Sequence, residues 1–347
     1  MNAPTRLRLS VLDQSVAVAG RGEDAAIRDT LDLAQHCERL GYARFWLSEH
    51  HGLPTIVGSA PEILMAAIAA RTERIRIGSA GVMLPHYSAL KVAEQFRVLE
   101  ALAPGRIDLG VGRAPGGDMR TARALNPNAY AAAEAFPEQV RDMQAWTADG
   151  THLGITAHPL GPSAPEIWIL GSSDYGAQLA AHFGLPYAFA YFFTDGQGTA
   201  EALGIYRQVY KPSPRHPRPQ ATLCIWALAA ETREEAEHHA LSRERWRIDR
   251  ARGVYGPLQA PDDIAARGFS AAEMSTVEPM RAKAFVGSAA EVAEKMRRLA
   301  AHFELDEVVV NTWAHDPAVR RRSYALLARE FGLEAAVEPS DAGAAPA

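Results

Sequence analysis

Apolar residues recur in eight strand-like runs along the chain, separated by segments with helical spacing. The helical spacing is clear at Val92, Phe96 and Leu99, whose intervals of four and three place them on one face of a helix. Several strand-like runs are continuously apolar, as at 308–310, which is typical of strands covered on both faces. The eight runs occupy residues 7–14, 44–51, 74–84, 106–113, 166–173, 186–193, 221–229 and 306–313.

Alternating strands and helices predict a parallel sheet, and eight such strands predict a closed (β/α)8 TIM barrel. Segments 114–165 and 230–305 are too long for single helices, so we expect insertions after strands 4 and 7. We expect one barrel domain over residues 1–334. Residues 335–347 are small and polar with no periodicity, which predicts a disordered C-terminal tail.

Two predicted helix starts agree with this order of strands and helices. Thr232 with Glu235 and Ser288 with Glu291 have the spacing of capping boxes, in which side chains satisfy free N–H groups of the first turn. We therefore expect helices to begin at these two positions.

Composition narrows the class of protein. Lys and Arg number 36 against 41 Asp and Glu, a net charge of −5, without the clustered basic residues that nucleic-acid binding requires. No run approaches the roughly 18 apolar residues of a membrane span, and we expect a cytoplasmic protein with no membrane partner. Cys37 and Cys224 have no metal-binding spacing, so we expect two buried, reduced thiols and no metal site.

Several common nucleotide-binding and catalytic motifs are incomplete or absent in the sequence. Gly110-x-Gly112 is followed by Pro115, where a dinucleotide-binding fingerprint has a third glycine. No lysine follows a glycine, which excludes a P-loop, and no Gly-x-Ser-x-Gly elbow is present. The sequence therefore does not indicate a Rossmann domain, a P-loop nucleotide hydrolase or a serine hydrolase.

His50 is the best single catalytic candidate. Alternation along the second strand sends Phe45 and Leu47 to one face, which suits the helix side, and Trp46 and His50 to the other. His50 then points into the barrel mouth at a C-terminal strand end, where barrel enzymes place their active sites. A structural, hydrogen-bonded histidine is the alternative.

A candidate phosphate cradle follows the fifth strand. Gly171 lets backbone approach a ligand, Ser172 and Ser173 offer hydroxyls, and the following helix presents free N–H groups. Arg113, at the end of the fourth strand, could reach the same phosphate. The alternatives are a capped helix start without ligand and an ion pair of Arg113 at the barrel rim.

Aromatic side chains at strand ends could line a flat ring system. Tyr191 and Phe193 stand at the end of the sixth strand and Trp313 at the end of the eighth. Such residues equally suit a simple hydrophobic core.

A set of motifs in fixed order identifies a family. The chain resembles the bacterial luciferase-like flavin-dependent monooxygenases from about residue 6 to 333, and is most similar to their single-chain branch. The motifs are 46–51 (WLSEHH), 77–86 (IGSAGVMLPH), 91–95 (KVAEQ), 104–113 (PGRIDLGVGR), 171–173 (GSS), 184–186 (GLP) and 285–288 (FVGS).

The resemblance implies a (β/α)8 barrel with FMN bound at its C-terminal mouth. The histidine next to the flavin corresponds to His50, and a non-proline cis peptide beneath the flavin ring corresponds to Ala80-Gly81. The aromatic wall corresponds to Tyr191.

The phosphate contacts implied by the resemblance are Arg113, Gly171, Ser172 and Tyr175. Light-emitting relatives carry an acidic residue where this chain has Gly171, so light emission is not implied.

The expected activity is a monooxygenase that uses reduced FMN and O2 to oxidise a small, aldehyde-like organic substrate. The resemblance further implies a separate flavin reductase and a homodimer formed through segment 61–103. Two alternatives stay open: an oxidoreductase that uses the deazaflavin F420 on the same barrel, and a non-catalytic flavin-binding protein.

Overall fold

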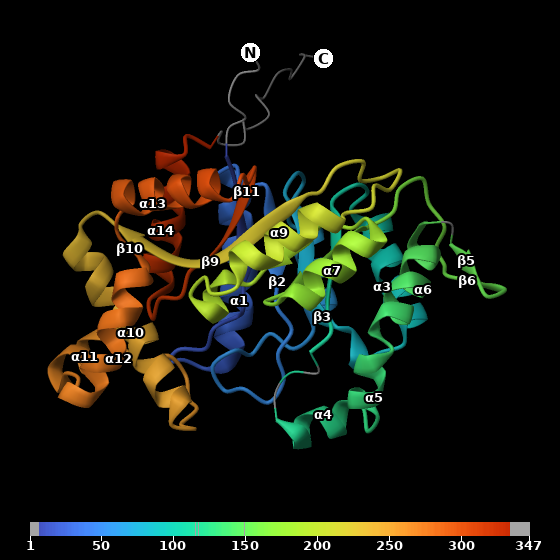
Figure 1. Cartoon of the computed structure of the whole chain (residues 1–347). Helices are drawn as coiled ribbons and strands as arrows, with labels where there is room; N and C mark the ends of the chain where they lie inside the picture. Colours follow the sequence, from blue (N-terminus) through green and yellow to red (C-terminus); the bar gives the residue numbers. More distant parts are fainter. Residues whose placement is uncertain (1–6, 115, 117, 149, 334–347) are drawn as a thin grey trace, which may run out of the picture.

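Eight parallel strands form a closed ring in the computed structural model, which describes residues 7–114, 116, 118–148 and 150–333 (Figure 1). Pairing of the sixth and seventh barrel strands, β8 and β9, closes the ring and confirms the predicted (β/α)8 barrel. In ring order the strands are β1 (Arg8–Asp13), β2 (Arg44–Leu47), β3 (Arg76–Met83), β4 (Ile107–Gly112), β7 (Glu166–Gly171), β8 (Tyr187–Phe189), β9 (Ala221–Ala230) and β11 (Glu307–Asn311).

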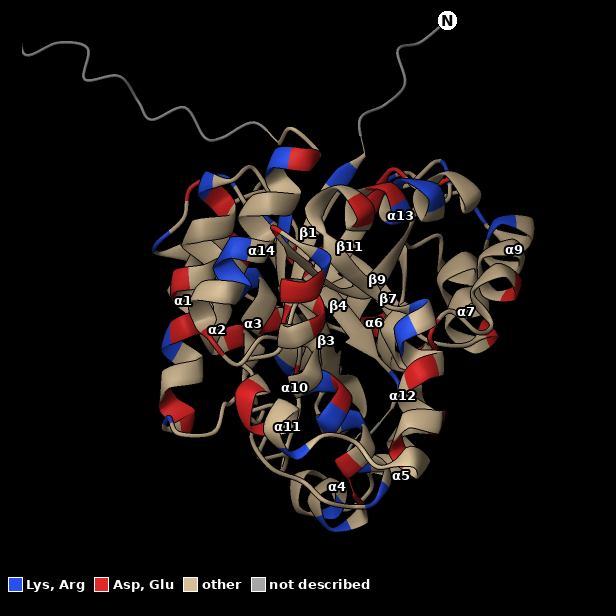
Figure 2. Ribbon diagram, turned by 90° about the vertical axis from the view of Figure 1, so that its left-hand side faces the viewer, with Lys and Arg blue, Asp and Glu red and all other residues tan. Residues whose placement is uncertain are grey.

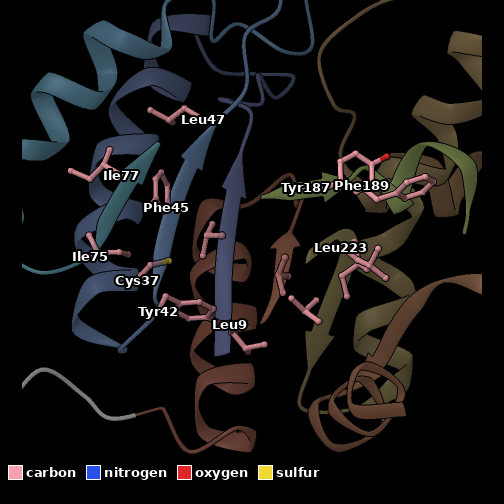
Figure 3. Packing of buried hydrophobic residues seen from close by; sticks show 14 of the residues in the cluster. Leu9, Cys37, Tyr42, Phe45, Leu47, Ile75, Ile77, Tyr187, Phe189 and Leu223 are labelled. Carbon is pink, nitrogen blue, oxygen red and sulfur yellow. The ribbon is translucent and has the colours of Figure 1, made fainter. Parts of the chain in front are cut away.

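Helices surround the ring and bury its outer face. Phe45 and Leu47 of β2 belong to this outer core, as alternation predicted, whereas Trp46 belongs to the cluster inside the barrel. Figure 3 shows Phe45 and Cys37 within the outer layer, between the strands and the helix that precedes β2. The outer helices are α1 (Glu23–Arg39), α2 (Pro61–Ala69), α3 (Ala89–Leu102), α7 (Asp174–Phe183), α9 (Thr199–Val209), α13 (Ala289–His302) and α14 (Pro317–Glu330).

The two long connections carry most of the additional elements. The connection after β4 holds α4 (Met119–Leu125), α5 (Ala129–Glu134), α6 (Phe136–Ala148) and the hairpin β5 (Thr151–His152) with β6 (Ile155–Thr156). The connection after β9 holds α10 (Arg233–Ala251), α11 (Pro261–Arg267), α12 (Ala271–Lys283) and β10 (Phe285–Ser288). Figures 1 and 2 show α4, α5, α10 and α11 at the same end of the barrel.

Local sequence signals are confirmed at several points. Thr232 caps α10 and Ser288 forms a capping box with Glu291 at the start of α13. Cys37 and Cys224 are buried free thiols. No helix in the described ranges is long and apolar enough to cross a membrane. The predicted tail, 335–347, lies outside the described residues.

The prediction of one strand over 186–193 is wrong. β8 ends at Phe189, and residues Tyr191–Thr194 form the short helix α8. Phe189 pairs with Gly171, the last residue of β7, so β7 offers the chain beyond β8 no further partner, although β9 on the other side runs on to Ala230. Helix α7, which follows β7, begins at Asp174.

A buried ionic network lies at the N-terminal end of the barrel. Arg44 donates to Asp108 Oδ2 at 2.8 Å, Glu166 Oε2 at 3.0 Å and Glu307 Oε1 at 3.0 Å. Burial alone would lower the pKa of Arg44, but the three carboxylates outweigh it and raise that pKa. One guanidinium thus joins four strands, β2, β4, β7 and β11.

The ionisation of Glu166 in turn depends on the positive charge of Arg44 and its neighbour Arg76. Burial opposes the ionisation of Glu166, but Arg44 and Arg76 outweigh it and hold its pKa below the ordinary value. A carboxyl with a lowered pKa stabilises the fold above its unfolded-state pKa of about 4.3, and this stabilisation is lost as the pH falls through the folded-state pKa.

Replacing Arg44 with Met is therefore expected to lower the free energy of unfolding at pH 7 by about 3–5 kcal/mol, because it leaves buried carboxylates without their counter-ion. Denaturant melts measure this change. The deficit should shrink toward pH 4, where the orphaned carboxyls can protonate. Arg28→Met, which breaks an exposed pair with Asp24, is the control and should change stability little. Equal stability of the two variants would contradict this role of Arg44.

Candidate active site

An apolar floor closes the barrel interior beneath its C-terminal mouth. Ala80, Leu170 and Phe192 are partly buried and pack onto the interior cluster that contains Trp46 and Trp168. They come from β3, β7 and α8, three elements that end on the same side of the barrel. The floor could therefore support one face of a flat ring.

The Ala80-Gly81 peptide bond is cis, as the family resemblance implied. The pairing of β3 with β4 is irregular here, because the register shifts between Ser79 and Val82. A side chain at position 81 would place its Cβ 2.3 Å from Leu170 Cδ1 and 2.7 Å from the carbonyl oxygen of Gly110. Only glycine fits at position 81 without displacing these two neighbours.

His50 lies just beyond β2 and is held by two short contacts. Its backbone N–H donates to the carbonyl of Gly58 at 3.0 Å, and its Nδ1 lies 3.1 Å from Ser48 Oγ. The adjacent acid, Glu49, is already engaged: it accepts from the Met83 backbone N–H at 2.9 Å and the Tyr87 hydroxyl at 2.6 Å. Among the described residues, no carboxylate contacts His50 Nε2, which leaves that nitrogen for other partners.

The surroundings of His50 favour its neutral form. Burial lowers the pKa of His50 to about 4, and the positive charge of Arg250 on α10 acts in the same direction. At neutral pH the imidazole is uncharged and can accept a proton.

The candidate phosphate cradle brings β4 and β7 together. The guanidinium of Arg113 lies 4.0 Å from the ring centroid of Tyr175, at the start of α7. Among the described residues, Arg113 forms no ion pair, so the predicted alternative of a rim ion pair is not found there. Ser173 is the N-cap of α7 but makes no side-chain capping bond, and Gly171 and Ser172 precede it. Its free hydroxyl suits an anion.

The aromatic residues are arranged differently from the prediction. Tyr191 packs against the outer core, with its ring centroid 6.1 Å from that of Phe285. Phe193 is 53% exposed. Phe192 is the residue of this segment that contacts the interior cluster. Because the segment is helical, alternation does not hold, and the structure does not bring Tyr191 onto the floor with Ala80.

Helix α10, whose start at Thr232 was predicted, brings side chains to the mouth that sequence reasoning did not single out. Trp246 donates from Nε1 to Thr55 Oγ1, in the loop after β2, at 2.9 Å, and its ring centroid lies 4.7 Å from that of Trp313. Arg243 of the same helix lies over the ring of Trp226 on β9, 4.2 Å from its centroid. The sequence signal for these residues was a run of arginines around a single tryptophan, Trp246, in this polar helix.

The titration of His50 tests this description of the mouth. We expect a pKa of about 4 for His50 by NMR, and a higher value, still below 6.5, in Arg250→Gln, because burial remains when the nearby charge is removed. His50→Gln identifies the resonance. A wild-type value near 6.5 would show that His50 is solvated and would contradict the geometry.

The lowered pKa of His50 also makes the stability of the folded protein depend on pH. The unfolded chain binds a proton on His50 below about pH 6.5, whereas the folded protein does so only below about pH 4. Lowering the pH from 6.5 to 4 therefore removes stability through this residue.

Comparison with known proteins agrees with the fold and with the sequence motifs. The family described as luciferase-like monooxygenase matches residues 7–303. A luciferase-like monooxygenase of Escherichia coli strain K12 is 37% identical over 323 residues, which is 92% of this chain and 96% of the relative.

Two further relatives are similar over nearly their whole length. An N-acetyl-S-alkylcysteine monooxygenase of Bacillus subtilis is 37% identical over 329 residues, covering 92% of this chain and 97% of the relative. The crystal structure of apo-MsnO8 superposes with a TM-score of 0.87 at 34% identity, covering 95% of this chain and all of that one. The chain belongs to the luciferase-like monooxygenase family.

Proposed function

We propose that this protein is an FMN-dependent monooxygenase that oxidises a small organic molecule with O2. The observation that carries the proposal is the Arg113 guanidinium, which lies beside the start of α7 without an acidic partner among the described residues. A phosphate group would supply the missing negative charge.

The residues at the mouth fit FMN. Arg113, the hydroxyls of Ser172 and Ser173 and the backbone at Gly171 would hold the phosphate, with Tyr175 beneath the guanidinium. The apolar floor formed by Ala80, Leu170 and Phe192 would support the ring next to the Ala80-Gly81 peptide. Tyr191 is a weaker candidate for ring contact, because it packs outward against Phe285.

Reduced FMN would supply the two electrons with which one oxygen atom of O2 enters the substrate and the other leaves as water. A separate flavin reductase would deliver the reduced cofactor, as the family resemblance implies. His50, neutral at pH 7, would accept or return a proton beside the reacting atoms. The floor and α10 would exclude water from them.

Two classes of substrate are indicated. Aldehydes are the class that the resemblance implies, and thioethers are the class that the name of the Bacillus subtilis relative indicates. The name of that relative makes N-acetyl-S-alkylcysteines the first compounds to try.

Two other functions remain as outcomes of experiment. A deazaflavin F420 oxidoreductase would use the same phosphate cradle but transfer hydride without oxygen. A non-catalytic flavin-binding protein would bind FMN and consume no oxygen in the presence of any substrate.

Arg113→Ala is expected to weaken FMN binding by about 10- to 100-fold, because a charge-assisted hydrogen bond to phosphate is lost. Riboflavin, which lacks the phosphate, should bind the variant and the wild type equally. Fluorescence titration measures both ligands. Arg298→Ala, on the exposed face of α13, is the control and should leave FMN binding unchanged. An equal loss of riboflavin binding would mean that Arg113 supports the fold rather than the phosphate.

We also propose that the protein is a homodimer through α2 and α3. Ile63, Val98 and Leu102 are 66%, 48% and 59% exposed and line one groove between these helices. An apolar groove of this kind is typical of a surface covered by a second copy.

Sedimentation tests the dimer. Val98→Asp should weaken self-association by about 100-fold or more, because it buries a charge in an apolar contact. Leu153→Asp, at an exposed position between β5 and β6, is the matched control and should remain dimeric. A wild-type protein that sediments as a monomer would refute the proposed dimer.

A further inference from the structure

Arg243 occupies an unusual position at the mouth. It projects from α10 onto Trp226, whose ring centroid lies 4.2 Å from the guanidinium carbon. Trp226 belongs to β9, on the same side of its strand as Cys224, which lies in the barrel interior. Arg243 therefore lies over the mouth. In the ring of strands, β8 separates β9, which carries Trp226, from β7, which ends at the phosphate cradle.

The acids near Arg243 are already neutralised. Asp195 accepts from Arg247 at 3.0 and 2.8 Å through both of its oxygens. Glu244 accepts from Arg281 at 2.7 Å through each of its two oxygens. Both carboxylates are thus held by bidentate pairs with other arginines. Within the described part of the chain, no carboxylate forms an ion pair with Arg243.

The environment disfavours this isolated charge. Burial, together with the positive charge of Arg247, lowers the pKa of Arg243 to about 9. A partly buried cation without a counter-ion costs free energy unless a partner arrives.

The indole N–H of Trp226, which lies beside Arg243, also lacks a hydrogen-bond acceptor. The Nε1 atom of Trp226 is buried and has no hydrogen-bond partner among the described residues, although the side chain is only 6% exposed. Buried indole N–H groups normally find a partner. A guanidinium fork and an indole N–H, stacked on each other and both unsatisfied, together form a site for an anion.

We infer that Arg243 and Trp226 bind the carboxylate of the substrate. The inference rests on the proposed function, because it assigns the substrate to the α10 side of the mouth and the cofactor phosphate to the Arg113 side. A carboxylate matches the planar fork of Arg243 and accepts from the indole as well. The substrates are therefore small organic acids rather than neutral aldehydes.

Binding of matched acids and amides tests this assignment. Three acids serve as probes, N-acetyl-S-benzylcysteine, phenylacetate and benzoate, each beside its carboxamide, and calorimetry is done on the full-length protein with and without FMN. At least one acid should bind wild type about 10- to 100-fold more tightly than its amide, as expected for charge-assisted hydrogen bonds. Arg243→Met should abolish that preference, and Arg243→Lys should restore part of it.

Arg233→Met, at the exposed start of the same helix, is the matched control and should keep the preference of the wild type. Circular dichroism melts establish that each variant is folded. The inference is overturned if no acid binds better than its amide, or if Arg243→Met weakens FMN binding while the acid preference persists. A wild type that prefers acids but does not bind FMN would refute the proposed function and leave this inference standing.

Discussion

The barrel depends on the pairing of charge in its interior. At the N-terminal end, Arg44 is surrounded by carboxylates from three other strands, so the buried charges compensate one another and join the strands across the ring. Above this layer the interior is filled by tryptophan and aliphatic side chains, which separate the network from the C-terminal mouth.

The C-terminal mouth differs from the N-terminal end in the pairing of two of its arginines. Arg113 and Arg243 lie at this end without carboxylate partners in the described chain, although acids such as Asp195 are close by and engaged elsewhere. His50 lies at the same end and is kept neutral. Arginines without a counter-ion near a mouth are typical of a site that anionic ligands complete. We assign the cofactor phosphate to Arg113 and the substrate carboxylate to Arg243.

Much of this architecture follows from local pattern, and the failures have identifiable causes. The eight strands and the outward packing of Phe45 were predictable because alternation has a period of two and each strand is buried. The helix at Tyr191 was not, because a short aromatic run does not by itself distinguish a strand from a helix. Arg243 was missed because an arginine in a polar helix resembles a solvent-facing residue. Only tertiary contacts place it on Trp226 and show that neighbouring acids are already taken.

We propose above all that the mouth takes reduced FMN for reaction with oxygen. The most direct measurement is an anaerobic titration of the purified protein with FMN and with deazaflavin F420, each oxidised and reduced, followed by admission of oxygen while absorbance is recorded. We predict that reduced FMN binds more tightly than oxidised FMN, and that bound reduced FMN reoxidises at a rate different from that of free flavin. Binding of deazaflavin alone, or reoxidation of FMN at the rate seen without protein, would contradict it.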